Sequence, residues 1–268
     1  MELTHKINYS FKRHFRALML GLFIAFGIID LFNRGYNRLA TTLFCFAFGA
    51  AFFYRHMKKQ NKIDLNFAVV VIGCDSGLGY SLALHCRTLG FAVIASVLNM
   101  DDPNVEELHQ TGIYVYKMDL VDQQSVRNFG CVLREILNKE NLGLYALVNN
   151  AGLMVIGDFE WQTEEQMMHQ INVNVAGTMR ITKEIIPLLR KHRGRIILIS
   201  SHCAVEPLPG FAIYGATKSA IRAWATSLRV ELKKQDIRVI CFAPDFVSYM
   251  MHFTLNVLIR KSMLACTA

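Results

Sequence analysis

The stretch NFAVVVIGCDSGLGYSLALHCRTLG, residues 66–90, carries the signals that decide the fold. Its first eight residues are almost wholly apolar and rich in valine, which is typical of a strand buried on both faces. A glycine-rich segment follows, and then a helical pattern that ends at Gly90. The sequence therefore predicts a buried strand over 66–73, a tight turn and a helix.

The glycine-rich segment GCDSGLG places Gly73, Gly77 and Gly79 in the spacing G-x-x-x-G-x-G. Glycines at a strand-to-helix turn allow a tight bend and a close approach of the backbone to a pyrophosphate. The N-terminus of the helix then offers N–H groups and a positive dipole to phosphates. Glycines also end strands for purely structural reasons, but their place in the first strand–helix turn favours a nucleotide site.

The chain beyond this stretch alternates between strand and helix patterns. Strands are predicted at 91–98, 113–118, 144–149, 194–200 and 237–243, and helices at 105–111, 122–140, 163–192 and 214–233. Strands rich in Val and Ile, separated by helices, indicate a parallel sheet covered on both faces. We therefore predict an α/β fold, a doubly wound parallel sheet (Rossmann fold), for residues 63–268.

The 268-residue chain has a formal net charge of +8, and this charge lies entirely in its first 62 residues. Residues 63–268 hold as many acidic as basic residues, so we expect no nucleic-acid partner. The seven cysteines are scattered without a C-x-x-C pair, and the nine histidines lack ligand spacing. This pattern predicts no metal site and mostly buried thiols in a reducing compartment.

Residues 1–62 contain two apolar runs, 17–32 and 39–54, with basic residues outside both. The runs are slightly shorter than the roughly 20 residues of a membrane span, but their composition favours a membrane-associated helical hairpin. A cleaved signal peptide, a mitochondrial presequence, buried soluble helices, a single span or a hairpin in one leaflet are the alternatives. The basic flanks predict both ends in the cytosol. We expect attachment to the endoplasmic reticulum, with a cytosolic catalytic domain, or to a mitochondrial membrane.

A tyrosine and a lysine stand four residues apart in SSHCAVEPLPGFAIYGATK, residues 200–218. On a helix this spacing puts Tyr214 and Lys218 on one face, where an ammonium would tune a phenol. The same spacing also arises by chance, so the pair alone leaves an ordinary surface position open.

Beside the glycine pattern, the chain carries NNAG at 149–152, an acid closing the third strand, an asparagine in NVAG and a serine thirteen residues before the tyrosine. With these motifs in this order, it resembles the short-chain dehydrogenase/reductase family over residues 66–247, and within that family the membrane-attached retinol and 17β-hydroxysteroid dehydrogenase branch. The resemblance implies that the catalytic residues are Asn174, Ser201, Tyr214 and Lys218. It implies that the cofactor contacts Gly73, Ser76, Gly77, Leu78, Gly79, Asp119, Asn150, Ala151, Gly152, Tyr214 and Lys218.

The resemblance also implies a role for each catalytic residue. Tyr214 would exchange a proton with the substrate while hydride passes to or from a nicotinamide. Ser201 would orient the substrate oxygen, Asn174 would hold a water of the proton relay, and Lys218 would bind the nicotinamide ribose. A free phenol has a pKa of about 10, and the ammonium and the oxidised nicotinamide would both lower that of Tyr214.

The cofactor is expected to be NAD rather than NADP. Neither 95–100 nor the glycine turn contains a Lys or Arg for a 2′-phosphate, and Asp75 would repel one. Asn99 is the candidate partner of the ribose. The family also implies a possible homodimer through the helices of 163–192 and 213–234.

The sequence thus predicts an oxidoreductase that interconverts a hydroxyl and a carbonyl on a small hydrophobic substrate, a steroid, sterol or retinoid taken from the membrane. The alternative is a catalytically idle nucleotide-binding or scaffold protein. The chain departs from the family pattern at Ile72, where threonine is usual, and at Asp245, where Pro-Gly is usual. Because 24 residues follow Pro244, we expect an apparently shortened C-terminus, an open substrate pocket and impaired activity.

Overall fold

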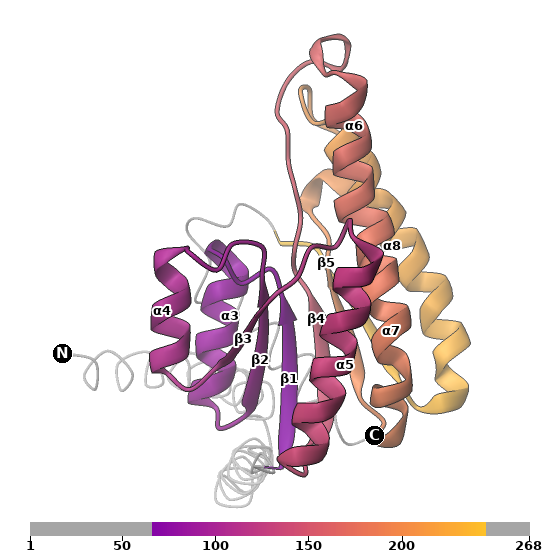
Figure 1. The fold of residues 1–268 in the computed structure, drawn as a ribbon. Coiled ribbons are helices and arrows are strands. Elements are labelled where there is room, and N and C mark those ends of the chain that lie inside the picture. The colour runs from indigo at the N-terminus through magenta and orange to yellow at the C-terminus, as the bar shows by residue number, and fades with distance from the viewer. Residues whose placement is uncertain (1–65, 245–268) are drawn as a thin grey trace, which may run out of the picture. The chain divides into compact units, whose positions relative to one another are not determined.

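The computed structural model describes residues 66–244 (Figure 1). The chain divides into two compact units, Met1–Asn61 and Lys62–Ala268, and the described residues all belong to the second. Within 66–244, no helix combines the length and apolar character needed to cross a membrane. The predicted membrane hairpin and the C-terminal segment 245–268 lie outside the described residues.

Six parallel strands form one sheet in the order β3-β2-β1-β4-β5-β6. They are β1 Phe67–Ile72, β2 Ala92–Val97, β3 Tyr114–Lys117, β4 Gly143–Asn149, β5 Arg195–Ile199 and β6 Arg238–Phe242. The order runs outward in opposite directions from β1 and β4, which confirms the doubly wound parallel sheet. In such sheets ligands bind beyond the carboxyl ends of the strands at this reversal point.

Helices cover both faces of the sheet (Figure 1). The main ones are α3 Gly77–Thr88, α4 Pro103–Gln110, α5 Gln123–Lys139, α6 Glu164–Ile171, α7 Thr178–Lys191 and α8 Ala212–Leu232. Short turns lie at η1 Phe159–Trp161, η3 His202–Ala204 and η4 Lys233–Gln235, and a π-helical segment, η2 Asn172–Gly177, joins α6 to α7. The helical region predicted over 163–192 thus consists of α6, the π-helical η2 and α7 in succession.

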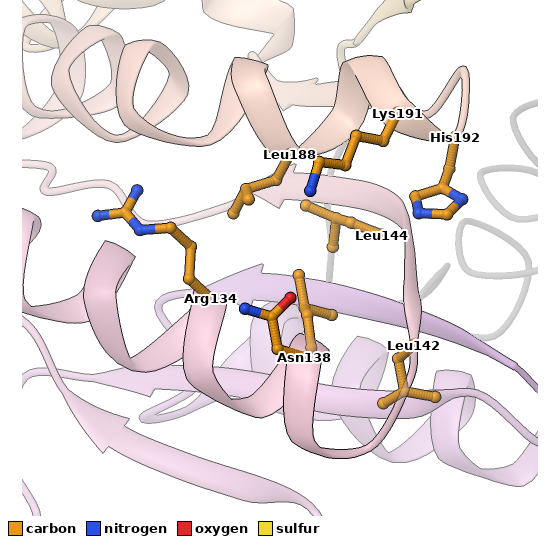
Figure 2. Close-up of a pocket in the computed structure, with 8 residues that line it drawn as sticks. Arg134, Asn138, Leu142, Leu144, Leu188, Lys191 and His192 are labelled. Carbon is orange, nitrogen blue, oxygen red and sulfur yellow. The ribbon is translucent and has the colours of Figure 1, made fainter.

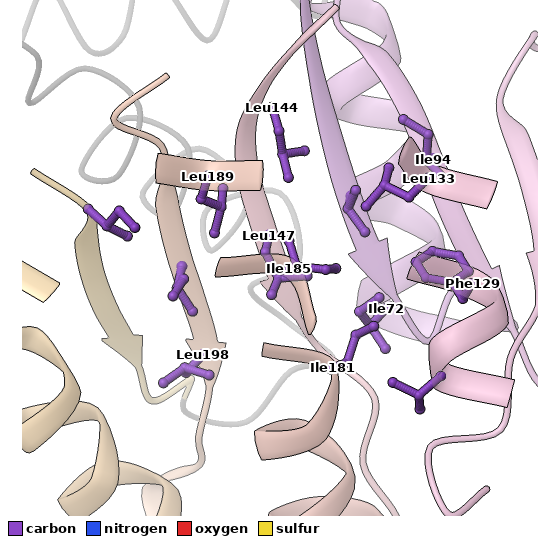
Figure 3. Packing of buried hydrophobic residues seen from close by; sticks show 14 of the residues in the cluster. Ile72, Ile94, Phe129, Leu133, Leu144, Leu147, Ile181, Ile185, Leu189 and Leu198 are labelled. Atoms are coloured by element: carbon purple, nitrogen blue, oxygen red, sulfur yellow. The ribbon is translucent and has the colours of Figure 1, made fainter. Parts of the chain in front are cut away.

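The core consists of two apolar clusters, one on each face of the sheet. Alternate residues of β1 divide between them, since Val70 and Ile72 belong to the cluster under α5, α7 and α8, and Val69 and Val71 to the cluster under α3 and α4. Figure 3 shows α7 side chains packed over the central strands in the first cluster. Burial on both faces explains why each strand is a continuous apolar run rather than an alternating one.

Side-chain caps set the starts of three helices. Asp102 accepts a hydrogen bond from the backbone N–H of Asn104 at the start of α4, and Asp122 accepts one from Gln124 at the start of α5. Thr163 and Gln166 form a reciprocal capping box at the start of α6. Each cap satisfies N–H groups that the first turn leaves without a partner, so these boundaries are encoded locally.

Candidate active site

The segments that carry the predicted site residues gather at the carboxyl edge of the sheet. The glycine turn follows β1, Asn150–Gly152 follow β4, and Ser201 follows β5. Because β1 and β4 are neighbours, the first two segments meet at the reversal point of the sheet. Asp119 follows β3, two strands away from β1, where its carboxylate accepts the backbone N–H of Val121 at 2.8 Å.

The glycine turn interlocks with the segment after β4. The Asn150 side-chain amide donates to the Gly73 carbonyl at 2.8 Å. A Cβ on Gly79 would lie 1.9 Å from that carbonyl oxygen and 2.4 Å from Asn150 Nδ2, so no larger residue fits. Gly77 differs, because its φ of +59° favours glycine while a Cβ there would meet no atom within 4 Å. Open space therefore lies over Gly77.

The glycine turn has polar contacts from a neighbouring strand although residue 72 is isoleucine. Ile72 is part of the core, 1% exposed. Its neighbour on β2, Ser96, accepts the Gly73 N–H at both its carbonyl oxygen (3.1 Å) and its hydroxyl (3.2 Å). The carbonyl of Ser96 also accepts the N–H of Cys74 at 2.8 Å. The turn is thus held without the threonine.

The N-terminus of α3 fits the phosphates of a dinucleotide. Ser76 at the N-cap makes no side-chain capping bond, and the first turn contains no acidic residue. The dipole of this helix is therefore not offset locally, and the open space over Gly77 lets a phosphate group approach the backbone. Leu78 and Gly79 continue this first turn, so the residues present suit the cofactor that the sequence predicts.

Tyr214 and Lys218 lie on α8, as predicted, with Lys218 Nζ 5.6 Å from the centre of the tyrosine ring. Lys218 is 4% exposed and its ammonium donates to the Ile199 carbonyl at 3.0 Å. Burial lowers the pKa of Lys218 to about 8. Lys218 is thus buried and Tyr214 is half-buried, so the pair is not an ordinary exposed surface pair.

The electrostatics of Tyr214 differ from the sequence expectation. Burial raises the pKa of this phenol above its ordinary value, and a hydrogen bond with Ser201 only partly offsets the rise. The neighbouring lysine does not reverse this effect in the protein alone. A lowered pKa of Tyr214 would have to come from the positive charge of an oxidised nicotinamide.

Asn174 lies in η2 and is 2% exposed. Its side-chain oxygen accepts the Leu153 N–H at 2.7 Å, and its Nδ2 donates to the Leu153 carbonyl at 2.8 Å. A second bond from Nδ2 reaches the Thr217 hydroxyl at 3.0 Å. A Cβ on Gly152 would lie 3.1 Å from Lys218 Nζ and 3.5 Å from Asn174 Oδ1, so both groups border the same space.

The structure therefore brings Asn174, Gly152 and Lys218 together, and Ser201 with Tyr214. Sequence reasoning missed Thr217 and Ser96, because a hydroxyl beside a motif carries no signal without its partner. It also missed how Asp75 is held, since the Leu98 and Asn99 N–H groups that bind it follow a different strand.

The rest of the described part of the chain gives weaker evidence for a functional site. Figure 2 shows a hollow at the opposite, amino edge of the sheet, between α5, α7 and β4. Arg134, which lines it, is paired with Glu184 at 2.9 Å, and none of the predicted site residues borders it. Between residues 66 and 244 no group of three His, Cys, Asp or Glu could hold a metal ion.

The five cysteines of this region are free thiols, of which Cys74 and Cys86 are buried and Cys131 is exposed. The expectation of mostly buried thiols therefore holds for only two of these five. The other two, Cys203 and Cys241, are of intermediate exposure.

The chain is similar in sequence and fold to known proteins. Residues 67–256 match the family described as short chain dehydrogenase. Estradiol 17-beta-dehydrogenase 2 of Mus musculus is 36% identical over 181 residues, 66% of this chain and 47% of that protein. Mitochondrial D-beta-hydroxybutyrate dehydrogenase of Mus musculus is 34% identical over 182 residues, 66% of this chain and 53% of that protein. The chain thus spans about half the length of these relatives.

A solved short-chain dehydrogenase from Streptomyces avermitilis superposes with a TM-score of 0.60 and 25% identity, over 66% of this chain and 65% of that one. Since the family match alone covers well over half of the residues, this chain belongs to the short-chain dehydrogenase family.

Proposed function

We propose that the protein is an NAD-dependent oxidoreductase that interconverts a hydroxyl and a carbonyl on a small, neutral, hydrophobic substrate. The observation that carries the proposal is the placement of Ser201, Tyr214, Lys218 and Asn174 on the side of the sheet where the glycine turn lies. Dehydrogenation of an alcohol requires a proton acceptor beside a hydride acceptor, and this placement puts the proton acceptor on the same side of the sheet as the turn that would hold the cofactor.

The chain's own residues supply the acid–base part of the reaction. NAD, when bound at the glycine turn, supplies the hydride acceptor. Tyr214 takes the proton of the substrate hydroxyl, and Ser201, which hydrogen-bonds to Tyr214, orients the substrate oxygen. Lys218 holds positive charge in the buried site at neutral pH, because its pKa of about 8 lies above 7. Asn174 faces the same space as the Lys218 ammonium and holds the water of the proton relay.

The preference for NAD is supported by Asp75. Its carboxylate accepts the N–H groups of Leu98 at 2.7 Å and of Asn99 at 3.1 Å. Those bonds fix a negative charge at the carboxyl end of β2, where the adenosine ribose lies in dinucleotide folds. A 2′-phosphate at this position would meet that charge with no Lys or Arg in 95–100 to offset it.

The charge of the loops around the site distinguishes a neutral from an anionic substrate. The segments 150–165 and 200–213 contain five Asp or Glu and no Lys or Arg. His202, the ring nearest Ser201 in sequence, is engaged by Glu206 at 2.7 Å. A carboxylate such as hydroxybutyrate would find repulsion here rather than a partner.

Apolar side chains on the same loops suit a hydrophobic substrate. Met154 and Ile156 follow the segment after β4, and Val205 and Leu208 follow Ser201; all four are exposed, by 40–63%. The two loops are joined by a hydrogen bond from the Gly157 N–H to the Gly210 carbonyl at 3.0 Å. Apolar surface of this kind next to a polar site is typical of a binding surface. A neutral steroid or similar alcohol therefore fits better than a small acid.

Residues 1–62 are the part of the chain that we propose to bind the membrane. We propose that their two apolar runs attach the protein to the endoplasmic reticulum, with the mitochondrial membrane as the alternative, and that the catalytic domain is cytosolic. A hydrophobic substrate would then be available from the bilayer.

The test uses the full-length chain in mild detergent and follows the absorbance of NADH. Estradiol and estradiol 3-sulfate form a matched pair, since the sulfate adds a negative charge far from the 17-hydroxyl. We expect turnover of estradiol with NAD, at least about tenfold lower kcat/KM for the sulfate at low salt, and a smaller difference at high salt. Faster oxidation of D-β-hydroxybutyrate than of any neutral alcohol, or a lower Kd for NADP than for NAD, would contradict the proposal.

A further inference from the structure

We propose that Thr217 is a positioning residue, which holds the amide of Asn174 in the orientation that the proton relay requires. The inference rests on the proposed function, since it assigns a role within the same reaction. It concerns a residue outside the Tyr214–Lys218 pair.

The hydroxyl of Thr217 links two parts of the site. Its Oγ1 donates to the Tyr214 carbonyl at 2.7 Å and accepts from Asn174 Nδ2 at 3.0 Å. Because the hydroxyl has one proton, donation to Tyr214 leaves its lone pairs for Asn174. The direction of both bonds is therefore fixed.

The amide of Asn174 has both of its N–H groups engaged, one by the Leu153 carbonyl and one by Thr217. Its oxygen accepts the Leu153 N–H and faces the space that also borders Lys218 Nζ. A flipped amide would place an N–H group toward Leu153 N and toward the ammonium. Thr217 thus stabilises the one orientation in which an acceptor faces the lysine.

Burial makes this hydroxyl hard to replace. Thr217 and Asn174 are each 2% exposed, so bulk water cannot take over the bond. Asn174 also lies in η2, a π-helical segment, where the usual helical bonds that would fix its backbone are displaced. The bond between Thr217 and Asn174 therefore connects α8, which carries Tyr214, to the π-helical segment η2.

The test compares Thr217→Val, which keeps the shape and loses the hydroxyl, with Thr217→Ser, which keeps the hydroxyl. Both are made in the full-length chain and assayed with estradiol and NAD, alongside NADH binding by fluorescence. We expect Thr217→Val to lower kcat by about tenfold or more, while KM and the Kd for NADH stay within about threefold. Thr217→Ser should restore kcat to near the wild-type value.

Two further readouts separate positioning from a general loss of structure. The pH profile of kcat should shift in Thr217→Val and not in Thr217→Ser, because the relay to Lys218 is changed only in the former. In an Asn174→Ala background, Thr217→Val should lower kcat little further, since the group that it positions is gone.

Equal kcat values for Thr217→Val and Thr217→Ser would overturn the positioning role of Thr217. If the wild-type chain still turns over estradiol, the proposed oxidoreductase function is unaffected by that result. Independent effects of Thr217→Val and Asn174→Ala would also overturn the positioning role. A wild-type chain that oxidises no alcohol would contradict the proposed function, and this role with it.

Discussion

Lys218 is an ionisable residue buried from solvent, with 4% of its surface exposed. Burial lowers its pKa from 10.5 to about 8, so between these values the unfolded chain binds a proton that the folded chain has lost. The contribution of Lys218 to the free energy of unfolding must therefore rise as the pH rises from about 8 to 10.5. Below about 8 the full penalty of the buried ammonium applies.

A Lys218→Met variant tests this sign, because methionine has a similar length and no charge. Relative to wild type, the variant should gain stability at pH 7, and that gain should shrink by about 3 kcal/mol as the pH approaches 10.5. Urea unfolding of both proteins at several pH values measures the difference, and other titrating groups cancel in the comparison. A stability difference that is independent of pH would show that the pKa of Lys218 is not lowered.

At the scale of single residues, the sequence predicted which side chains matter but not how they are held. Tyr214 and Lys218 were singled out by their spacing, and Asn174 was implied by the family resemblance. The pKa shifts of Tyr214 and Lys218, and the bonds of Asn174 with Thr217 and Leu153, depend on tertiary contacts. The same holds for the bond between Gly73 and Ser96. The expected fall in the pKa of Tyr214 was wrong for the protein alone, because burial outweighs the bond with Ser201.

At the scale of elements, the glycine turn between β1 and α3 offers two substitutions with different consequences. Gly79→Ala drives a Cβ into the Gly73 carbonyl, so it should lower stability by about 1–3 kcal/mol or more and disturb Asn150 as well. Gly77→Ala meets no atom and strains only the backbone, at about 1–2 kcal/mol. Its methyl group occupies the open space over the turn, so the Kd for NADH should rise by about tenfold or more.

Thermal unfolding and NADH fluorescence of the two variants measure these effects side by side. A Gly77→Ala variant that binds NADH as wild type does would show that the cofactor phosphates lie elsewhere.

All the predicted strands and helices occur, because each strand is a run of apolar residues bounded by glycine or polar caps. The π-helical segment η2 was not predicted. The apolar spacing continues through 163–192, and the interruption is associated with the bonds of Asn174 to Leu153 and Thr217, which are tertiary contacts. The loop 150–163 likewise depends on the buried side chain of Gln170, which accepts from the Val155 N–H and donates to Gln162.

At the scale of the whole molecule, the charge is unevenly distributed along the chain. Residues 1–62 carry the entire net charge of +8 together with two apolar runs. We predict that alkaline carbonate leaves the full-length protein in the membrane pellet, and that added protease digests the catalytic domain in sealed microsomes. Release by carbonate would rule out an integral anchor, and protection from protease would overturn the orientation.

The homodimer stays a prediction that sedimentation of the detergent-solubilised protein can test.

The most direct test of the central claim is the oxidation of estradiol by the full-length protein and by its Tyr214→Phe variant, followed as NADH formation. The account predicts turnover by wild type and a loss of at least about a hundredfold in the variant, because only the proton-transferring hydroxyl is removed. NADH binding should be nearly unchanged, which shows that the variant is folded. A variant that keeps the wild-type rate would contradict the assignment of Tyr214 and the mechanism built on it.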